Sequence, residues 1–494
     1  MRFVTWCKKA LPTITQILWV VLIASLPLTS VQLLARLFGS DAVASPAILV
    51  VFFMVVIWLF PYLLQGGKLV GSSIPLFLFG MVAVIATLLS YFQVIPAYKG
   101  IDNINSTVEA VITLVIGVCF YLVSSSYMKD EKQAKLTLKI INWSGLFMLL
   151  WAGMQAVAWQ GFGRYPQWMF DLQGFVSKRV LYRQRVTGLA LEPSWFAHQL
   201  NMVYLPIWLS ATIKGFTAHN KKLGFLTLEN FLLMAGIGAL LLTLSRVGLL
   251  AFILMFTFFL IKLHTYLVEK TLAHLSRKQE EEISGERKKR LKVIVSVLFI
   301  IAYMILLVLG LWIFSKVDPR MENLFSFSFG NDNPLLSYFN ELSFGERVVY
   351  WLAGWNTFTE HPILGVGLGN AGYYFPKAIT PYGWNLIEVR QLVYRSSNLM
   401  NVKSLWVRLL AETGMVGFSF FCGWLYSMVV KFGKKANSQK KLVSVYATAG
   451  IFMLCALIAE GFSIDSFAMP YLWVGLGLAS ADFADETAKK ESHI

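Results

Sequence analysis

The chain has 494 residues, of which 57% are hydrophobic and only 14% are charged. This composition, together with a mean hydropathy of +0.62, excludes a soluble globular protein and indicates an integral membrane protein. The net charge of +16 would suit a nucleic-acid-binding protein, but in a protein with many membrane spans it mostly reflects cytoplasmic lysines, so we expect no nucleic-acid partner.

Apolar runs of about 20 residues recur along the chain, and a helix needs this length to cross the hydrocarbon core of a bilayer. Because the runs are continuous rather than alternating, they favour helices over a β-barrel. The sequence therefore predicts an all-α polytopic membrane protein with about 12 transmembrane helices. The predicted spans are residues 14–37, 46–65, 73–94, 106–127, 138–160, 193–213, 225–244, 246–268, 293–315, 404–430, 442–463 and 468–482.

The N-terminus has some features of a signal peptide, because Arg2, Lys8 and Lys9 precede an apolar run. The run continues to about Phe38, which favours an uncleaved first span. The spans and loops predict four parts. These are helices 1–5 over residues 1–160, a core of the first outer loop and helices 6–9 over 161–315, a large outer loop between helices 9 and 10 over 316–403, and helices 10–12 with a cytoplasmic tail over 404–494.

Lysine and arginine are distributed differently between the two sides of the predicted membrane. With both termini placed in the cytoplasm, 23 of the 28 lysines lie on the inner side, which is the usual signal of topology. In contrast, 11 of the 15 arginines lie on the outer side. Since arginine presents a planar fork that suits phosphate and carboxylate oxygens, these arginines indicate an anionic ligand. The alternative is that long outer loops escape the charge bias and use arginine in salt bridges.

The first long outer loop carries three arginines and a carboxylate where it enters the sixth span. Arg179, Arg183 and Arg185 are followed by Glu192 at the expected start of a helix, where a negative charge is favoured. Such a group at the mouth of a span is costly unless it handles an anionic ligand. The alternative is that Glu192 is an N-terminal charge that pairs with Arg185.

Two further segments lie at predicted outer positions. Arg246, in Ser245-Arg246-Val247-Gly248, lies between the seventh and eighth spans and either reaches lipid head groups or points into a shared cavity. Arg347 opens an amphipathic helix that ends at His361 and leads into a glycine-rich turn over 365–370, which ends at Asn370. Alternate glycines allow a backbone to approach a ligand closely.

An aromatic and basic run over 373–395 follows the glycine-rich turn and contains Arg390 and Arg395. Aromatic faces stack on sugar rings and arginine holds anionic groups, so the run is a candidate glycan-binding surface. The alternative is that its tryptophan and tyrosine residues anchor the protein in the lipid interface.

The last segment begins where the second long outer loop re-enters the membrane. It contains Lys403, Arg408 and Glu412, and the carboxylate lies about two and a half turns into the tenth span. An ionisable residue at that depth is a functional candidate. The alternative for Glu412 is a structural hydrogen bond between helices.

Taken in order, the four segments resemble the bacterial O-antigen ligase and O-antigen polymerase superfamily. Family members typically show R-x-x-G-x-x-x-[NE]-P-[NS], S-R-x-G, R…H-P-x-x-G-x-G-x-G-N and A-E-x-G-x-x-G. The matching residues here are 185–194, 245–248, 347–370 and 411–417, so that the resemblance covers roughly residues 180–420.

The resemblance implies a C-type glycosyltransferase (GT-C) architecture in a bacterial inner (plasma) membrane. Its donor is a glycan on undecaprenyl pyrophosphate, and its active site lies on the periplasmic or extracellular face. It also implies that arginines hold the pyrophosphate and that neither a metal nor another cofactor is needed. The four cysteines form no CxxC pair and give no support for a thiolate metal site.

One departure from the family pattern separates its two subfamilies. Ligases resemble H-N-x-x-L-x-x-x-A-E-x-G in the last segment, and the histidine is their proposed base, whereas this chain has Lys403-Ser404 at that place. A lysine near its ordinary pKa stays protonated and cannot act as a base. The Glu-Pro-Ser version of the first segment also looks more like the polymerases.

The sequence therefore predicts a polymerase of the O-antigen, exopolysaccharide or capsule type. Glu192 is the predicted base, and Arg185, Arg246 and Arg347 are predicted to hold the pyrophosphate. Other predicted substrate-binding residues are Arg179, Arg183, His361, Asn370, Arg390, Arg395, Lys403, Arg408 and Glu412.

Expected partners are lipid-linked oligosaccharides, membrane lipid and a chain-length regulator. The first alternative is a ligase that moves glycan to lipid A core or to a protein. A lipid-linked sugar transporter would place ionisable groups near the bilayer midplane, which this sequence does not favour. A non-catalytic assembly subunit would have no essential arginine or glutamate.

Overall fold

The computed structural model describes residues 2–38, 44–178, 181–219, 226–278, 285–317, 344–396 and 398–483. Within these ranges the chain is helical and contains no named strand, and its β-type pairing is limited to isolated bridges such as that between Ser30 and Ser177. This confirms the predicted all-α class.

Eight of the described helices are long and apolar enough to cross a membrane. Shorter or interrupted helices cover the remaining predicted spans, so each of the 12 predicted spans falls on a helix and the polytopic class is confirmed. The eight are Pro46–Leu64 (α3, η1 and α4), α5 (Ser73–Ser90), α6 (Asn103–Tyr127), α7 (Glu131–Phe162), α12 (Arg246–Lys278), α13 (Gly285–Val317), α19 (Leu405–Lys435) and α20 (Lys441–Glu460). The others are α1 (Arg2–Ala24), α9 (Pro193–Gln199) continued by η2 (Leu200–Tyr204) and α10 (Leu205–Ile213), α11 (Leu228–Leu242), and α21 (Pro470–Ser480).

The first predicted span, residues 14–37, is not one continuous helix. Helix α1 ends at Ala24, and a separate helix α2 (Gln32–Phe38) follows after a break. Pro27 lies in this break, and its ring and missing N–H disfavour a helical backbone at that point. The freed backbone finds a partner elsewhere, because the Lys178 amide donates to the Ser30 carbonyl at 3.2 Å.

The helices form two compact units, each discontinuous in sequence. Unit 1 comprises Met1–Leu254, Gly354–Ala378 and Leu399–Ile494, and unit 2 comprises Met255–Ala353 and Ile379–Asn398. Helix α12 begins in unit 1 and ends in unit 2, whereas α16 (Gly345–Glu360) begins in unit 2 and ends in unit 1. The four-part division expected from the sequence stays a prediction.

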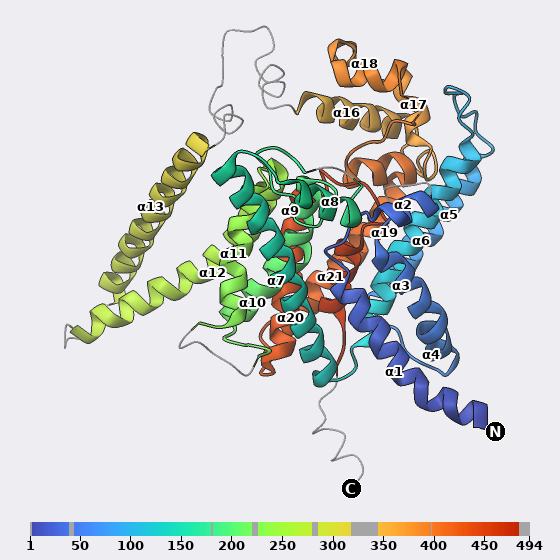
Figure 1. The fold of residues 1–494 in the computed structure, drawn as a ribbon. Helices are drawn as coiled ribbons and strands as arrows, with labels where there is room; N and C mark the ends of the chain where they lie inside the picture. Colours follow the sequence, from blue (N-terminus) through green and yellow to red (C-terminus); the bar gives the residue numbers. More distant parts are fainter. Residues whose placement is uncertain are drawn as a thin grey trace. The chain divides into compact units, whose positions relative to one another are not determined.

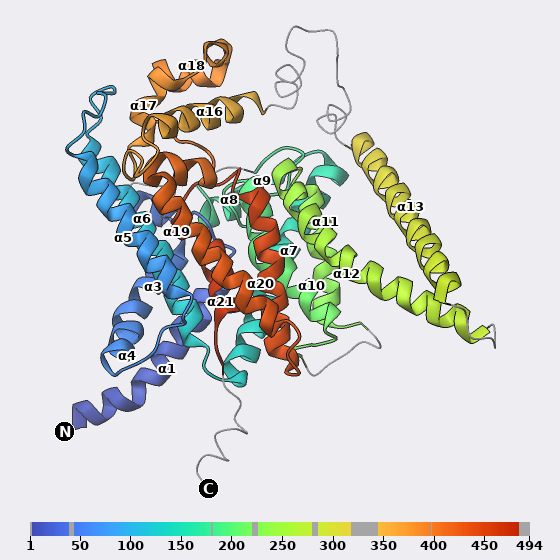
Figure 2. The same ribbon diagram turned by 180° about the vertical axis from the view of Figure 1, so that it is seen from behind.

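In unit 1, α19 packs along α5, α21 packs along α6, and α20 packs against α10 (Figures 1 and 2). Aromatic rings fill the space between α6, α19 and α21. The Trp424 and Trp473 rings stack with centroids 5.3 Å apart, and Tyr121 meets Trp424 edge-on at the same distance. Gly117 makes room for this core, since a Cβ there would lie 2.4 Å from the Trp473 ring.

Unit 1 also contains two short helices near the segments of interest, α8 (Gln167–Val176) and α17 (Ala371–Ala378). In unit 2, the second half of α12 packs on α13 through Val268, Leu272 and Val295. The same unit contains the start of α16, the 3-10 turn η3 (Pro381–Asn385) and α18 (Ile387–Tyr394).

Hydrogen bonds in unit 1 join segments that the sequence predicted to lie on the same side of the membrane. Among predicted outer segments, the Lys403 amide donates to Asp465 and the Asn370 amide group donates to Ser90. Among predicted inner segments, the Lys214 ammonium group donates to the Ala436 carbonyl. The packing therefore follows the predicted alternation of spans, and we refer to the end with α8 and the start of α9 as the site end.

Candidate functional site

The first two sequence segments meet at the site end of unit 1. The Arg185 Nε atom donates to the Thr243 carbonyl at 2.9 Å, and the Val186 amide donates to the Leu242 carbonyl at 3.0 Å. Thr243 ends α11 and lies three residues before Arg246, with Leu244 between them in the left-handed region (φ 50°). Arg185 is thus fixed beside the turn from which Arg246 opens α12, and both side chains are half-buried.

Helix α7 holds the segment that carries Arg185. The Gln155 side chain accepts from the Thr187 and Gly188 amides, both at 3.0 Å, and donates to the Gly188 carbonyl at 3.0 Å. Gly188 has a φ of 56°, and a Cβ there would lie 3.1 Å from the Phe196 ring. This turn therefore needs glycine both for its conformation and for the packing of α9.

Tyr165 fixes the other end of the arginine segment. Its hydroxyl donates to the Tyr182 carbonyl at 2.8 Å. Burial raises the pKa of Tyr165 to about 12, so the phenol stays protonated and remains a donor at neutral pH. Arg183, on the same segment, is exposed, and Arg179 lies outside the described residues.

Glu192 occupies the N-cap position of α9 and is half-buried. Within the described structure its carboxylate does not cap the helix by accepting from an α9 amide. Instead, one carboxylate oxygen accepts from the Ser194 hydroxyl at 3.2 Å. Pairing with Ser194 rather than capping is compatible with a chemical role for Glu192, and that role stays a prediction.

Helices α9 and α12 begin side by side at the site end. A Cβ on Gly248 would lie 2.5 Å from the Ala197 Cβ, so the two helices touch where glycine permits it. The Asn201 side chain also donates to the Gly248 carbonyl at 2.7 Å. This contact explains the glycine of the Ser-Arg-Val-Gly segment as a packing residue between α9 and α12.

Helix α19 is broken at Gly414, whose φ of 61° and ψ of −169° are not helical. The glycine-rich turn docks on this break. The Val366 and Gly367 amides donate to the Ala411 and Glu412 carbonyls at 2.9 and 3.0 Å, and the Met415 amide donates to the Pro362 carbonyl at 2.8 Å. Non-helical backbone inside a membrane protein needs such protein partners.

The alternate glycines of the turn approach protein rather than open space. Each has a positive φ, and a Cβ on Gly365, Gly367 or Gly369 would lie 2.5, 2.8 and 2.5 Å from atoms of α19, α5 and α6, respectively. The structure shows close approach between helices, and Gly369 also lines a polar cavity, so close approach of the turn to a ligand stays a prediction. The turn is a joint that fixes α19 against α5 and α6.

Asn370 completes this joint and is fully buried. Its Nδ2 atom donates to the Ser90 hydroxyl at 3.1 Å and to the Val366 carbonyl at 3.0 Å, while its Oδ1 accepts from Thr107 at 3.3 Å. His361, at the start of the turn, packs its ring edge-on against Tyr374 with centroids 5.3 Å apart. Substrate binding by these two residues stays a prediction.

A polar cavity of about 270 Å³ lies between the broken helix, the glycine-rich turn and the start of α6. The Arg408 Nε atom and the Glu412 carboxylate form an ion pair at 2.9 Å on its wall. Arg408 Nη1 also donates to the Asp465 carbonyl at 2.7 Å, and its guanidinium lies 4.6 Å from the centre of the Phe467 ring. The other polar residues of the wall are Ser106, Glu109, Thr113, Asn401 and Ser466.

Replacing Glu412 with leucine is expected to destabilise the protein by about 3–5 kcal/mol, because it leaves the Arg408 charge buried without its counter-ion. Arg408 and Glu412 side chains are only 13% and 6% exposed, so solvent screens them little. Thermal unfolding of the purified protein measures the loss. The double variant Arg408→Met, Glu412→Leu should recover most of it, and simple addition of the two single effects would contradict this.

The Lys403-Ser404 pair forms the start of α19. Ser404 is the N-cap, accepts from the Val407 amide at 3.5 Å and donates to the Gly461 carbonyl at 3.1 Å. Lys403 has a φ of 53°, and its amide donates to the Asp465 carboxylate at 3.1 Å. The Lys403 amide and the Ser404 hydroxyl thus stabilise the start of α19. The predicted contact of Lys403 with substrate stays a prediction.

The structure adds residues that the sequence analysis missed. Asp465 links Lys403 to Arg408, and Glu109 contributes a further carboxylate to the cavity. Among the described residues, no group of three or more His, Cys, Asp or Glu side chains gathers closely enough to hold a metal ion. His198 and Glu460 form a buried pair deeper in the bundle, 3.2 Å apart. The only sequence signal for Glu460 was an ionisable residue near the end of an apolar span.

The remaining predicted residues lie in unit 2. The Arg347 guanidinium lies 5.9 Å from the centre of the Phe344 ring, in the first turn of α16. Arg390 and Arg395 are exposed at α18 and at the residue that follows it. Their predicted roles toward substrate stay predictions.

A comparison with known protein families covers the second to fourth segments. Residues 231–422 match the family model described as O-antigen ligase. This confirms the resemblance to the O-antigen polymerase and ligase superfamily, whose members are glycosyltransferase-like enzymes. The matched region extends from α11 through the break in α19 and leaves Arg185 and Glu192 outside. No curated protein matches the chain.

The O-antigen ligase-type region therefore belongs to a polytopic helical membrane protein. The match supports, in general terms, a function of the O-antigen polymerase and ligase type. The matched residues include Arg246, Arg347, the glycine-rich turn and the Arg408–Glu412 pair.

Proposed function

We propose that this protein is a polysaccharide polymerase of the inner (plasma) membrane. It transfers a growing glycan from undecaprenyl pyrophosphate onto a lipid-linked repeat unit, at the outer face. The observation that carries the proposal is an apolar groove in unit 1 that reaches the segment of Arg185. A donor with an anionic head and a long apolar tail needs both features side by side.

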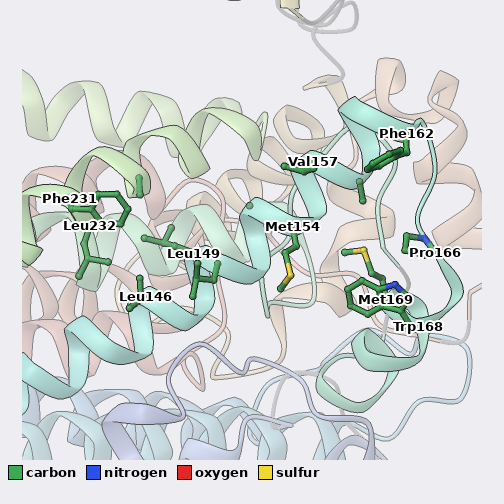
Figure 3. Close-up of a pocket in the computed structure, with 14 residues that line it drawn as sticks. Leu146, Leu149, Met154, Val157, Phe162, Pro166, Trp168, Met169, Phe231 and Leu232 are labelled. Carbon is green, nitrogen blue, oxygen red and sulfur yellow. The ribbon is translucent and has the colours of Figure 1, made fainter.

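The groove has a volume of about 560 Å³, and none of its 14 lining residues is charged. It runs along α7 from Leu146 to Phe162, with Phe231 of α11 near one end and Trp168 and Met169 of α8 at the other (Figure 3). In a membrane such a lining favours an isoprenoid or acyl chain, because it offers dispersion contacts and no polar partner.

The α8 end of the groove adjoins the arginine segment. Met169 and Ala158 line the groove and also belong to a buried cluster with Leu181, four residues before Arg185. Tyr165 of the same cluster donates to the Tyr182 carbonyl. A tail in the groove would therefore bring a pyrophosphate toward Arg185 and Arg246, which supports the predicted role of these arginines.

The proposed reaction needs a base, an acceptor hydroxyl and a stabilised leaving group. The acceptor oxygen forms a bond to the anomeric carbon of the donor sugar while the bond from that carbon to the pyrophosphate oxygen breaks. Glu192 takes the hydroxyl proton, and the bonding electrons leave with the lipid pyrophosphate. Arginines stabilise the charge that develops on this leaving group, which supports transfer without a divalent metal.

The polar cavity between α6 and α19 is the proposed place for the acceptor glycan. Carboxylates of Glu109, Glu412 and Asp465 can accept hydrogen bonds from sugar hydroxyls. Because Arg408 already pairs with Glu412 and with the Asp465 carbonyl, we assign it to the glycan rather than to the pyrophosphate. Lys403, which follows the lining residue Val402, remains a proposed contact to either substrate.

A ligase is the second candidate, since the matched family is described as O-antigen ligase. The polymerase is favoured by Lys403-Ser404, where the ligase pattern has His-Asn. The serine hydroxyl caps α19, and neither residue of this pair supplies the imidazole that is the proposed base in the ligase pattern.

The test uses purified protein in liposomes with lipid-linked repeat units extracted from producing cells that lack this gene. A polymerase lengthens these units without another acceptor, with or without EDTA. A ligase leaves them unchanged until lipid A core or an acceptor protein is added. The absence of glycan transfer under both conditions would overturn the proposed function, and transfer that stops in EDTA would overturn metal independence.

Replacing Glu192 with glutamine is expected to lower the transfer rate by about 100-fold or more, since general bases contribute about 10²–10⁴-fold. The glutamine oxygen can still accept from Ser194, so the melting temperature should stay within a few degrees of the wild-type value. Full activity of the variant would leave Glu192 with a structural role only. Ser194→Ala serves as the control, because it removes the hydrogen bond from Ser194 but keeps the Glu192 carboxylate.

A further inference from the structure

A cluster of buried polar side chains lies inside unit 1, between the α9–η2 helix and the end of α20. The His198 Nδ1 atom and the Glu460 Oε2 atom are 3.2 Å apart, and the Asn201 Nδ2 atom donates to Glu460 Oε1 at 2.7 Å. These three residues (His198, Glu460 and Asn201) are only 3%, 2% and 0% exposed, respectively. The edge of the His198 ring also faces the Tyr471 ring, with centroids 5.9 Å apart.

Stability alone does not account for this cluster. Burying a carboxylate costs several kcal/mol even when it is paired, and apolar side chains of similar volume are often at least as stable. The cluster also coincides with the π-helical turn η2, which begins at Leu200, and such turns occur frequently at functional sites. Next to it, both amide atoms of the buried Gln199 lack a hydrogen-bond partner within the described structure. The region therefore retains polar groups that a purely structural core would not require.

The Glu460 carboxylate joins the elements that carry the two halves of the proposed active site. His198 and Asn201 belong to the α9–η2 helix, whose N-cap is Glu192. Asn201 also binds the carbonyl of Gly248, two residues after Arg246. Glu460 itself ends α20, and the next residues continue directly to the acceptor cavity.

That continuation is held by short hydrogen bonds. The Leu405 amide donates to the Gly461 carbonyl at 2.7 Å, and Arg408 donates to the Asp465 carbonyl at 2.7 Å. An uninterrupted path of contacts thus extends from the α9 and α12 starts, through Glu460, to the Arg408–Glu412 pair. A change in the position of Glu460 would alter the distance between the proposed base and the acceptor cavity.

We infer that Glu460 and His198 are positioning residues that fix the donor side of the active site relative to the acceptor side. They hold α9 and α12 against the segment 460–466 and do not touch substrate. This inference rests on the proposed glycosyl transfer. The transfer reaction requires the acceptor hydroxyl within about 3–3.5 Å of the anomeric carbon, and a misplacement of about 1 Å can cost about 100-fold in rate.

The test compares Glu460→Gln, Glu460→Leu and His198→Leu in the liposome assay with extracted lipid-linked repeat units. We expect Glu460→Leu and His198→Leu to lower kcat by about 10–100-fold, while KM for the lipid-linked units stays within about twofold. Glu460→Gln should retain most of the activity, because its amide can donate to His198 and accept from Asn201. The double variant His198→Leu, Glu460→Leu should be no slower than either leucine variant alone.

A matched control exists at the opposite end of unit 1. The buried Glu229 accepts from the Asn142 Nδ2 atom at 2.9 Å and from the Ala218 amide at 2.9 Å, and its side chain is 0% exposed. Glu229→Leu should lower the melting temperature as Glu460→Leu does, but it should leave kcat of the folded protein unchanged.

Three outcomes would overturn the inference while leaving the proposed function intact. The first is wild-type kcat in folded Glu460→Leu, the second is an equal loss of kcat in Glu229→Leu, and the third is an effect on KM alone. Absence of transfer by the wild-type protein would instead overturn the proposed function.

Discussion

Replacing Arg185 with alanine is expected to abolish polymer while the protein remains in the membrane at its normal level. The Nε atom of the guanidinium donates to the Thr243 carbonyl, which fixes the side chain in place, and a guanidinium has five N–H donors that suit phosphate oxygens. Loss of one preorganised donor to a developing charge costs about 10²–10³-fold in rate. Gel analysis of extracted polysaccharide measures the product, and immunoblotting of membranes measures the protein.

Two companion variants separate charge from geometry at this site. Arg185→Lys keeps the charge but cannot reproduce a fork that binds both a carbonyl and a phosphate, so we expect it to recover only part of the activity. Arg164→Ala removes an exposed arginine from the same predicted outer loop and should have no effect. Normal long polymer in the Arg185→Ala strain would show that the pyrophosphate is held elsewhere.

Gly414→Ala is expected to prevent the protein from reaching its folded state. The Gly414 backbone lies in a region that is open essentially only to glycine. In addition, an alanine Cβ would lie 2.3 Å from the Ile363 carbonyl oxygen, which belongs to backbone and cannot easily move away. Backbone strain alone costs about 1–3 kcal/mol, and the clash adds to it, so little monodisperse protein should be recovered after solubilisation.

The same helix provides the control for this prediction. Gly423 also lies in α19, but a Cβ there meets no atom within 4 Å. Because alanine is the better helix former by about 1 kcal/mol, Gly423→Ala should match or slightly exceed the wild-type melting temperature. Equal yield and equal melting temperature for the two variants would mean that the break in α19 does not depend on glycine.

The helical spans could be predicted from sequence because apolar length is a local property of the chain. Each predicted span falls on a helix in the structure, including the short last one over 468–482, which contains α21 (Pro470–Ser480). The first span was wrong over residues 25–31. Pro27 lies in the break after α1, and the Ser30 carbonyl accepts from the Lys178 amide, a partner that no local pattern reveals because it is so distant in sequence.

The candidate site was predictable only in part for the same reason. The order of the motifs indicated that Arg185 and Arg246 bind the same ligand group. The sequence could not predict the hydrogen bond from Arg185 to the Thr243 carbonyl, because these residues are 58 positions apart. His198 and Glu460 were missed because they are 262 positions apart and each is a single polar residue in an apolar run. The glycine-rich turn was recognised, but its neighbours were not, since they belong to α5, α6 and α19.

The glycine-rich joint has a consequence for how the protein is made. The Leu368 amide donates to Thr87, which is 281 positions earlier in the chain, and Asn370 donates to Ser90, which is 280 positions earlier. Thr87 and Ser90 are therefore synthesised long before their hydrogen-bond partners. Contacts of such long range form slowly. The groove along α7 needs only residues 146–235, whereas the polar cavity needs residues up to 466. All the residues that line the groove are therefore synthesised before the last residues of the cavity, so the cavity can close only after the groove residues have left the ribosome.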